Sequence, residues 1–328
     1  MKNSILAALC ASLVFAGSAF AVTAADLPGA WPKGTVTYKC GYAPGGTQDL
    51  VVRSLAHYAE LITGNSYYVD NITGGSGLLM VNDVFGRDAD GSNACIYSLT
   101  IPTAADFKYF PPKLLKALMK ANVQLHAQMI PCAQVNVDYP ALFIRASETR
   151  FHTFKELAEY IKAHPGEIGF GATGASGNGG LMIQTLINKF GLEIKPVYYD
   201  STPVNKAAML NGEIDVMCAT IAWMPSSGKD FTCIGYAASK ASPEKYPGVP
   251  TFVESGYDFV ATMRRGMFVK KGTDQEIIDY MEKMYADICS NERYVKDQAK
   301  LNYTVDYETA ATFQAAINEV VDTYNKMK

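Results

Sequence analysis

The chain has 328 residues, of which 48% are hydrophobic and 19% charged, with a formal net charge of -3 at pH 7. This length suits about two domains, and the absence of a basic excess argues against a nucleic-acid-binding protein. No stretch beyond the N-terminal region is long and apolar enough for a membrane span, which needs about 20 residues.

The N-terminus predicts export. Lys2 supplies a positive charge, residues 5–16 are apolar, and Ala19-Phe20-Ala21 has the small-x-small pattern of a cleavage site. We therefore expect residues 1–21 to be a signal peptide that is cleaved near Ala21, so that Val22 begins the mature protein. A retained membrane anchor is the alternative.

Seven cysteines are present, and removing Cys10 with the signal peptide leaves six. An even number in an exported chain permits disulfides, in about 15 pairings, whereas the apolar surroundings of several of them favour buried free thiols. The spacings are long and include no C-x-x-C, so no metal site is expected. The six are Cys40, Cys95, Cys132, Cys218, Cys233 and Cys289.

Strand-like and helix-like patterns alternate along the chain. In chain order the expected elements are strand 35–42, helix 51–62, strand 66–69, helix 78–85, strand 94–99, helix 114–121, strand 141–145, helix 153–164, strand 167–171, helix 183–190, strand 196–199, helix 202–211, strands 214–219 and 232–237, and helices 273–288 and 310–324. Capping boxes are expected at Thr153 to Glu156 and at Thr273 to Glu276.

This alternation predicts an α/β architecture, with mostly parallel sheets flanked by helices. No flexible linker divides the chain, so we expect two lobes between which the chain crosses more than once, with a cleft between them. The expected division is residues 22–145 with 260–328 for one lobe, and 146–259 for the other. The crossings should then lie near Arg145 to Thr149 and Tyr257 to Arg265.

Three glycine- or hydroxyl-rich turns join a strand to a helix, at residues 41–50, 171–180 and 199–203. Helix N-termini present unpaired N–H groups and suit anions, and in open α/β sheets such turns lie where ligands bind. Thr47 is expected to cap the first of these helices, and Asp49 to lie in its first turn. Plain turn geometry explains any one of the turns alone; three together favour a cleft that binds a carboxylate.

Signals for catalysis are weak. A G-x-G-x-x-G match begins at Gly169, but it is weak alone and its glycines continue to Gly180. Ser176 stands one residue away from a G-x-S-x-G nucleophile elbow. The four histidines are scattered, and no convincing pair of nucleophile and base is present. We therefore expect no enzymatic activity and no cofactor; an exported serine-type hydrolase or nucleotide-dependent enzyme is the alternative.

Six segments in order resemble the solute-binding proteins of the tripartite tricarboxylate transporters, the Bug or TctC-like family. Pro44 to Asp49 is similar to the family's P-x-G-G-x-x-D loop, and Phe170 to Gly177 is similar to its Y-G-S-A-G-x-G-S loop. The other four are residues 71–77, 90–96, 209–215 and 247–256, although the family's Arg and Pro are replaced in the first of these.

The resemblance implies a two-lobed periplasmic-binding-protein fold of the Venus flytrap type, type II-like, located in the periplasm. It implies a monomer without enzymatic activity that holds a small carboxylate between its lobes and delivers it to the membrane permease. The ligand would be a di-, tri- or aromatic carboxylate or an acidic amino acid, and a sensor that docks on a receptor is an alternative role.

The expected ligand-binding residues come from the loops and strand ends described above. They are Tyr42, Pro44, Gly45, Gly46, Thr47, Gln48, Thr100, Thr173, Ala175, Ser176, Asn178, Tyr199, Asp200, Thr202, Thr220 and Arg264. Arg264 enters because Met263-Arg264-Arg265-Gly266 stands where the family usually has an aromatic pair. An arginine of this pair is expected to clamp a carboxylate, with the choice between Arg264 and Arg265 left open by the sequence; a solvated pair of arginines is the alternative.

Overall fold

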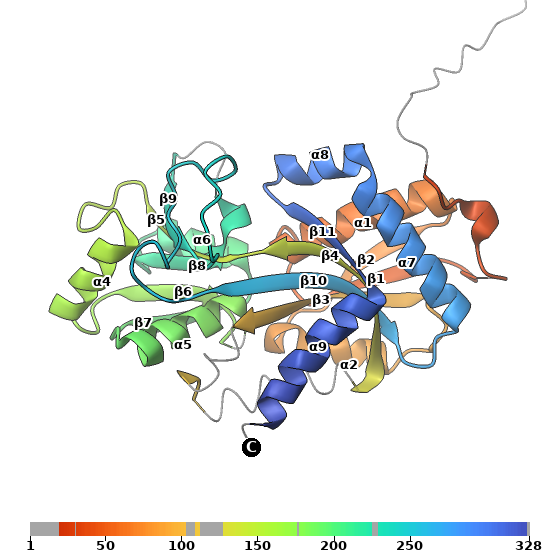
Figure 1. Cartoon of the computed structure of the whole chain (residues 1–328), viewed down its shortest axis with the longest axis horizontal. Coiled ribbons are helices and arrows are strands. Elements are labelled where there is room, and N and C mark those ends of the chain that lie inside the picture. Colours follow the sequence, from red (N-terminus) through yellow and green to blue (C-terminus); the bar gives the residue numbers. More distant parts are fainter. Residues whose placement is uncertain are drawn as a thin grey trace, which may run out of the picture.

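A computed structural model describes residues 20–29, 31–102, 109–111, 127–175, 177–224 and 229–326. The chain forms two β-sheets, each in its own lobe and each flanked by helices, with β10 running lengthwise between the lobes (Figure 1). The helix expected at 114–121 lies outside the described residues. Within them, no helix has the length and apolar character needed to cross a membrane.

The first lobe is built on a six-stranded sheet of order β11-β4-β10-β3-β1-β2. Its elements are η1 (Ala24–Asp26), β1 (Val36–Cys40), α1 (Thr47–Thr63), β2 (Tyr67–Asn71), η2 (Gly75–Gly77), α2 (Leu78–Phe85), β3 (Asn93–Pro102), β4 (Met129–Asp138), β10 (Ala261–Lys270), α7 (Gln275–Ser290), α8 (Glu292–Lys300), β11 (Thr304–Thr309) and α9 (Ala310–Asn325).

Both faces of this sheet are buried, because successive side chains of a strand point to opposite faces. On β3, Ala94 and Ile96 pack in the core formed with α1 and α7. Cys95 and Leu99 pack on the other face, with α2 and α9. The sheet is therefore a central layer between two helix layers, as the alternating sequence predicts.

The second lobe is built on a five-stranded sheet of order β7-β6-β8-β5-β9. Its elements are β5 (Pro140–Arg145), α4 (Phe154–Ala163), β6 (Gly169–Thr173), α5 (Asn178–Phe190), β7 (Lys195–Tyr199), α6 (Thr202–Leu210), β8 (Val216–Thr220), η4 (Ile221–Trp223) and β9 (Phe231–Tyr236). The helices α4 and α5 cover one face, and α6 covers the other.

The sheets are mixed, and the expectation of mostly parallel sheets is wrong in this respect. β1 is parallel to β2 and β3, and β6 is parallel to β7 and β8. The pairs that involve β4, β5 or β10 are antiparallel. These three strands lie at the crossings between the lobes. β5 and β10 run against the strands of the β-α-β units, whereas β4 runs in the same direction as β1 and β3, because both β4 and β3 are antiparallel to β10.

The sheet pairing also places the first crossing between the lobes earlier in the chain than expected. β4 ends at Asp138 in the first sheet, and β5 begins at Pro140 in the second. The chain therefore changes lobe at Tyr139, and not near Arg145 as expected, because the predicted strand at 141–145 belongs to the second sheet. The return falls before Ala261, where β10 begins in the first sheet, within the expected range.

The two expected capping boxes have different outcomes. Thr153 and Glu156 form a reciprocal capping box at the start of α4. At the second site, α7 begins at Gln275 after Asp274, and no side chain caps it. The hydroxyl of Thr273 instead donates to the carbonyl of Lys270, within the turn that ends β10. All six cysteines among the described residues are buried as free thiols.

An ion pair after β5, between the buried Glu148 and the partly exposed Arg150, makes the stability of the second lobe depend on pH. The Arg150 guanidinium donates to Glu148 over 2.8 and 2.7 Å, and it lowers the pKa of that carboxyl to about 2. A depressed pKa contributes stability above the unfolded-state pKa of about 4.3, and this contribution is lost as the pH falls toward 2.

We therefore expect Glu148→Gln to lower the free energy of unfolding by about 2–3 kcal/mol near pH 7. Chemical denaturation should show this difference shrinking as the pH falls from about 4.3 to about 2. Glu292→Gln is the control, since its ion pair with Lys296 is exposed and should contribute less than about 1 kcal/mol. A Glu148→Gln effect of equal size at both ends of this range would contradict the linkage.

Candidate functional site

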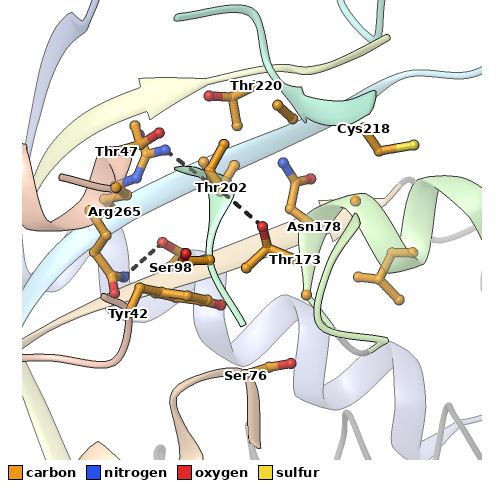
Figure 2. A pocket seen from close by; sticks show the side chains of 18 of the residues that line it. Tyr42, Thr47, Ser76, Ser98, Thr173, Asn178, Thr202, Cys218, Thr220 and Arg265 are labelled. Atoms are coloured by element: carbon orange, nitrogen blue, oxygen red, sulfur yellow. Dashed lines mark hydrogen bonds between the residues drawn. The ribbon is translucent and has the colours of Figure 1, made fainter. Parts of the chain in front are cut away.

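A cavity of about 100 Å³ lies between the two lobes, and both contribute to its wall. Figure 2 shows Tyr42, Thr47, Ser98 and Arg265 on the side of the first lobe, facing Thr173 and other residues of the second. The lining residues are Tyr42, Gly46, Thr47, Gln48, Ser76, Tyr97, Ser98, Thr173, Gly177, Asn178, Gly179, Leu181, Ser201, Thr202, Cys218, Ala219, Thr220, Met263 and Arg265.

The first helix end at the cavity is the N-terminus of α1. Its N-cap is Gly46, which has extended backbone angles and no side chain to bond the N–H groups of the first turn. Asp49 holds the preceding loop, because its carboxylate accepts from the N–H of Gly45 at 2.9 Å and from Asn71 at 2.8 Å. Gly45 has φ +80, which favours glycine there.

The expected side-chain cap by Thr47 is wrong. Thr47 is the first residue of α1, and its hydroxyl accepts a hydrogen bond from the indole of Trp223, across the cleft, at 2.8 Å. The first N–H groups of α1 are therefore left without a side-chain cap and face the cavity together with the positive end of the helix dipole.

Two helix ends of the second lobe reach the same cavity. α5 has the N-cap Gly177 and α6 has the N-cap Ser201, and neither N-cap makes a side-chain hydrogen bond to its helix. Gly179 allows α5 to approach β8, since a Cβ atom there would lie 3.1 Å from that of Cys218. Thr202 follows Ser201, and its hydroxyl lies 3.4 Å from that of Thr173.

The polar side chains of the wall are neutral, with one exception. Desolvation raises the pKa of Tyr42 to about 12 and raises that of the Cys218 thiol well above its usual value. Both groups are therefore protonated near neutral pH. Gln48 donates to the hydroxyl of Ser98 at 3.0 Å. The described lining residues include no acidic side chain, and Arg265 is the charged one.

The two arginines of β10 point in opposite directions, as neighbours on a strand must. Arg264, the expected carboxylate clamp, lies on the far side of the sheet from the cavity, where it pairs with Glu308 at 2.9 Å and contacts Gln134. Arg265 lines the cavity and is 1% exposed. Of the two arginines, Arg265 therefore lies at the cavity and Arg264 does not.

Half of the expected site residues line the cavity: Tyr42, Gly46, Thr47, Gln48, Thr173, Asn178, Thr202 and Thr220. Pro44, Gly45, Ala175, Tyr199, Asp200 and Arg264 are not among the lining residues. Pro44, Gly45, Ala175 and Asp200 are exposed instead, because the tip of a strand-to-helix turn faces solvent while the residues that open the helix face inward. Ser176 and the side chain of Thr100 are not among the parts of the chain that the structure describes.

Eleven lining residues were not predicted. Gly177, Gly179 and Ser201 fall within the two turns of the second lobe that the sequence had marked. Ser76 lies in the family-like segment 71–77, and Met263 and Arg265 lie in the run from Met263 to Gly266. The others lie on strands or in a helix without a local signal: Tyr97, Ser98, Leu181, Cys218 and Ala219. Across the described residues, no cluster of three or more His, Cys, Asp or Glu could hold a metal ion.

Two α/β lobes joined by crossing strands, with helix N-termini around a cavity between them, define a two-lobed solute-binding protein. The family model described as the tripartite tricarboxylate transporter family receptor, TctC, matches residues 51–327. The chain therefore belongs to this family, and the expected resemblance is confirmed. Such receptors bind small carboxylates and work with membrane transporter components.

Known proteins agree with this assignment. The chain is 26% identical to Protein BugT of Bordetella pertussis over 244 residues, which cover 72% of this chain and 71% of BugT. The solved structure of the periplasmic binding protein BugD has a TM-score of 0.76 and 22% identity, with 90% of this chain and 97% of BugD covered. MatC from Rhodopseudomonas palustris, solved with bound malate, has a TM-score of 0.78 and 21% identity, with 90% and 99% covered.

Proposed function

We propose that the mature chain, from about Val22, captures a small carboxylate between its lobes in the periplasm and delivers it to the permease of a tripartite tricarboxylate transporter. One observation carries the proposal: the N-terminal turns of α1, α5 and α6 line a single cavity, and none has a side-chain cap. Each turn offers N–H donors and partial positive charge to a carboxylate.

The volume of the cavity limits the size of the ligand. About 100 Å³ is smaller than the roughly 300–1,000 Å³ of sites for drug-sized ligands, which favours a short metabolite. The malate bound to MatC is a short dicarboxylate. A dicarboxylate also suits donors on two opposing lobes, because each lobe can hold one carboxylate. We therefore rank short dicarboxylates above tricarboxylates and aromatic acids.

The lobes are proposed to close on the ligand as rigid units. We assign residues 22–138 and 261–326 to the first lobe and residues 140–259 to the second. Direct contacts already join the lobes: Trp223 donates to Thr47, and Asn302 donates to the carbonyl of Met224 at 2.7 Å. A monomer that closes in this way would present a changed surface to the permease.

Thermal unfolding tests the proposal. Purified mature protein would be mixed with mono-, di-, tri- and aromatic carboxylates and with acidic amino acids. A ligand at about 100 times its Kd stabilises the folded state by about 2.7 kcal/mol, so a rise of several degrees in Tm is expected for at least one short dicarboxylate. The absence of any shift, together with turnover of an ester or a nucleotide, would overturn the proposal in favour of an exported enzyme.

Loss of the hydrogen bond between Trp223 and Thr47 should weaken binding. Trp223→Phe keeps an aromatic ring but removes the donor, and one hydrogen bond contributes a net of about 0.5–1.5 kcal/mol. We expect Kd to rise about 3- to 10-fold by titration calorimetry. Trp31→Phe is the matched control, since Trp31 is buried in the first lobe and its indole nitrogen has no partner among the described residues. Equal affinities in the two variants would contradict a role in closure.

A further inference from the structure

Arg265 introduces a full positive charge into a wall that is otherwise neutral. It is the largest of the fully buried side chains in the described chain, at 1% exposed. A buried charge needs compensation from its surroundings, and the lining residues described for the cavity provide no carboxylate. The compensation comes from behind the wall, on the neighbouring strand β4.

Two side chains of β4 fix the guanidinium in place. Nη1 of Arg265 donates to the amide oxygen of Asn136, its partner in the strand register. Nη2 donates to the carboxylate of Asp138 over 3.4 Å. Asp138 is 3% exposed and ends β4, just before the chain crosses to the second lobe. Both contacts engage the Nη end of the guanidinium.

The Nε–H of Arg265 takes no part in these two contacts. It is buried and has no hydrogen-bond partner among the described residues. A buried donor of a charged group without a partner is unfavourable, and native proteins pair nearly all such groups. Thr220 repeats the pattern from the opposite lobe: it lines the same cavity at 6% exposed, and its hydroxyl is also buried without a partner in the described chain.

We propose that Arg265 is a specificity-determining residue whose Nε–H binds an anionic oxygen of the ligand, so that the site selects dicarboxylates over half-amides of the same shape. This inference rests on the proposed carboxylate-binding function. Asn136 and Asp138 act as positioning residues, because they hold the guanidinium without touching the ligand. An α-ammonium group would meet no acidic side chain among the lining residues, so the site also disfavours amino acids.

The test compares ligands that differ in one charge. The probes are succinate and glutarate, each paired with its half-amide, succinamate and glutaramate. Titration calorimetry on the wild-type protein should show the better dicarboxylate binding about 10- to 100-fold more tightly than its half-amide, the range expected for a hydrogen bond to a charged group. The readout is this ratio, which a general loss of stability does not change.

Three variants distinguish recognition of the ligand's charge by Arg265 from a general effect on the folded structure. Arg265→Gln combined with Asp138→Asn replaces a buried ion pair by a neutral pair, and the ratio should fall below about 3 while the half-amide still binds. Asp138→Asn alone removes the counter-charge, and the ratio should rise. Arg264→Gln is the control, since Arg264 lies away from the cavity, and its ratio should equal that of the wild type.

A double variant that keeps the wild-type ratio overturns the inference, and so does a wild-type protein that binds the dicarboxylate and the half-amide equally well. Both results leave the carboxylate-binding function intact. If neither the probes nor any other carboxylate binds the wild-type protein, the proposed function fails and the inference fails with it.

Discussion

Replacing Gly177 by alanine is expected to weaken carboxylate binding by about 100-fold or more in a protein that still folds. Gly177 has φ -78 and ψ 177, which alanine adopts without strain. The difficulty is the Cβ atom, which would lie 2.5 Å from the carbonyl oxygen of Thr173. That oxygen belongs to the backbone of the same loop, so the loop must move.

The movement should displace the first N–H groups of α5 from the cavity. A hydrogen bond weakens steeply when its distance or angle departs from the preferred range, and several donors would shift together. The matched control is Gly191→Ala at the other end of α5. Gly191 has φ +66 and nothing within 4 Å of its added Cβ, so the change should lower stability by about 1 kcal/mol and leave affinity unchanged.

Calorimetric titration and chemical denaturation of the two variants separate the effects. The expected pattern is lost binding with modest destabilisation for Gly177→Ala, and unchanged binding with modest destabilisation for Gly191→Ala. Wild-type affinity in a folded Gly177→Ala protein would show that the N-terminus of α5 is not a ligand site.

The loops of the site could be predicted from the sequence because their chemistry is local. A glycine pair before a helical pattern specifies a strand-to-helix turn and the N-terminus of a helix. That reasoning located residues 46–48 and the stretch from Gly171 to Gly180, both of which contribute to the cavity. It could not tell the exposed tip of each turn from its inward end, so Pro44 and Ala175 were included.

The other features of the site depend on contacts between residues that are far apart in the sequence. Thr47 was expected to cap its own helix, but its hydroxyl bonds Trp223, a residue 176 positions away. The choice between Arg264 and Arg265 depends on which face of β10 meets the cleft, and a run of two arginines carries no such information. The strand β4 was not predicted at all, although Asn136 and Asp138 on it hold Arg265.

The antiparallel strand pairs could not be predicted for the same reason, because they join residues far apart in the sequence. Alternating strands and helices indicate β-α-β units, and these do supply the parallel part of each sheet. The crossing strands β4, β5 and β10 join sheets across long sequence separations, so local patterns give neither their order nor their direction. The crossing strand β10 contributes Met263 and Arg265 to the cavity wall, so their place in the site follows from this long-range pairing.

Replacing Gly46 by valine should abolish detectable binding, with a loss of about 100-fold or more, and should leave the protein folded. Gly46 has φ -75 and ψ 162, an extended conformation that suits a β-branched residue. Its new Cβ would lie 3.2 Å from the carbonyl oxygen of Ala43, which requires only a small shift. The three added carbon atoms would then occupy part of a cavity of about 100 Å³ and shield the first N–H groups of α1.

Gly34→Val is the matched control for this change. Gly34 is exposed and nothing lies within 4 Å of its added Cβ, so affinity and Tm should stay near the wild-type values. Calorimetric titration with a short dicarboxylate then compares the two lobes directly. Loss of binding in both Gly46→Val and Gly177→Ala means that each lobe contributes an anion site. Retained affinity in a folded Gly46→Val protein would remove α1 from the site and leave the carboxylate to the second lobe and Arg265.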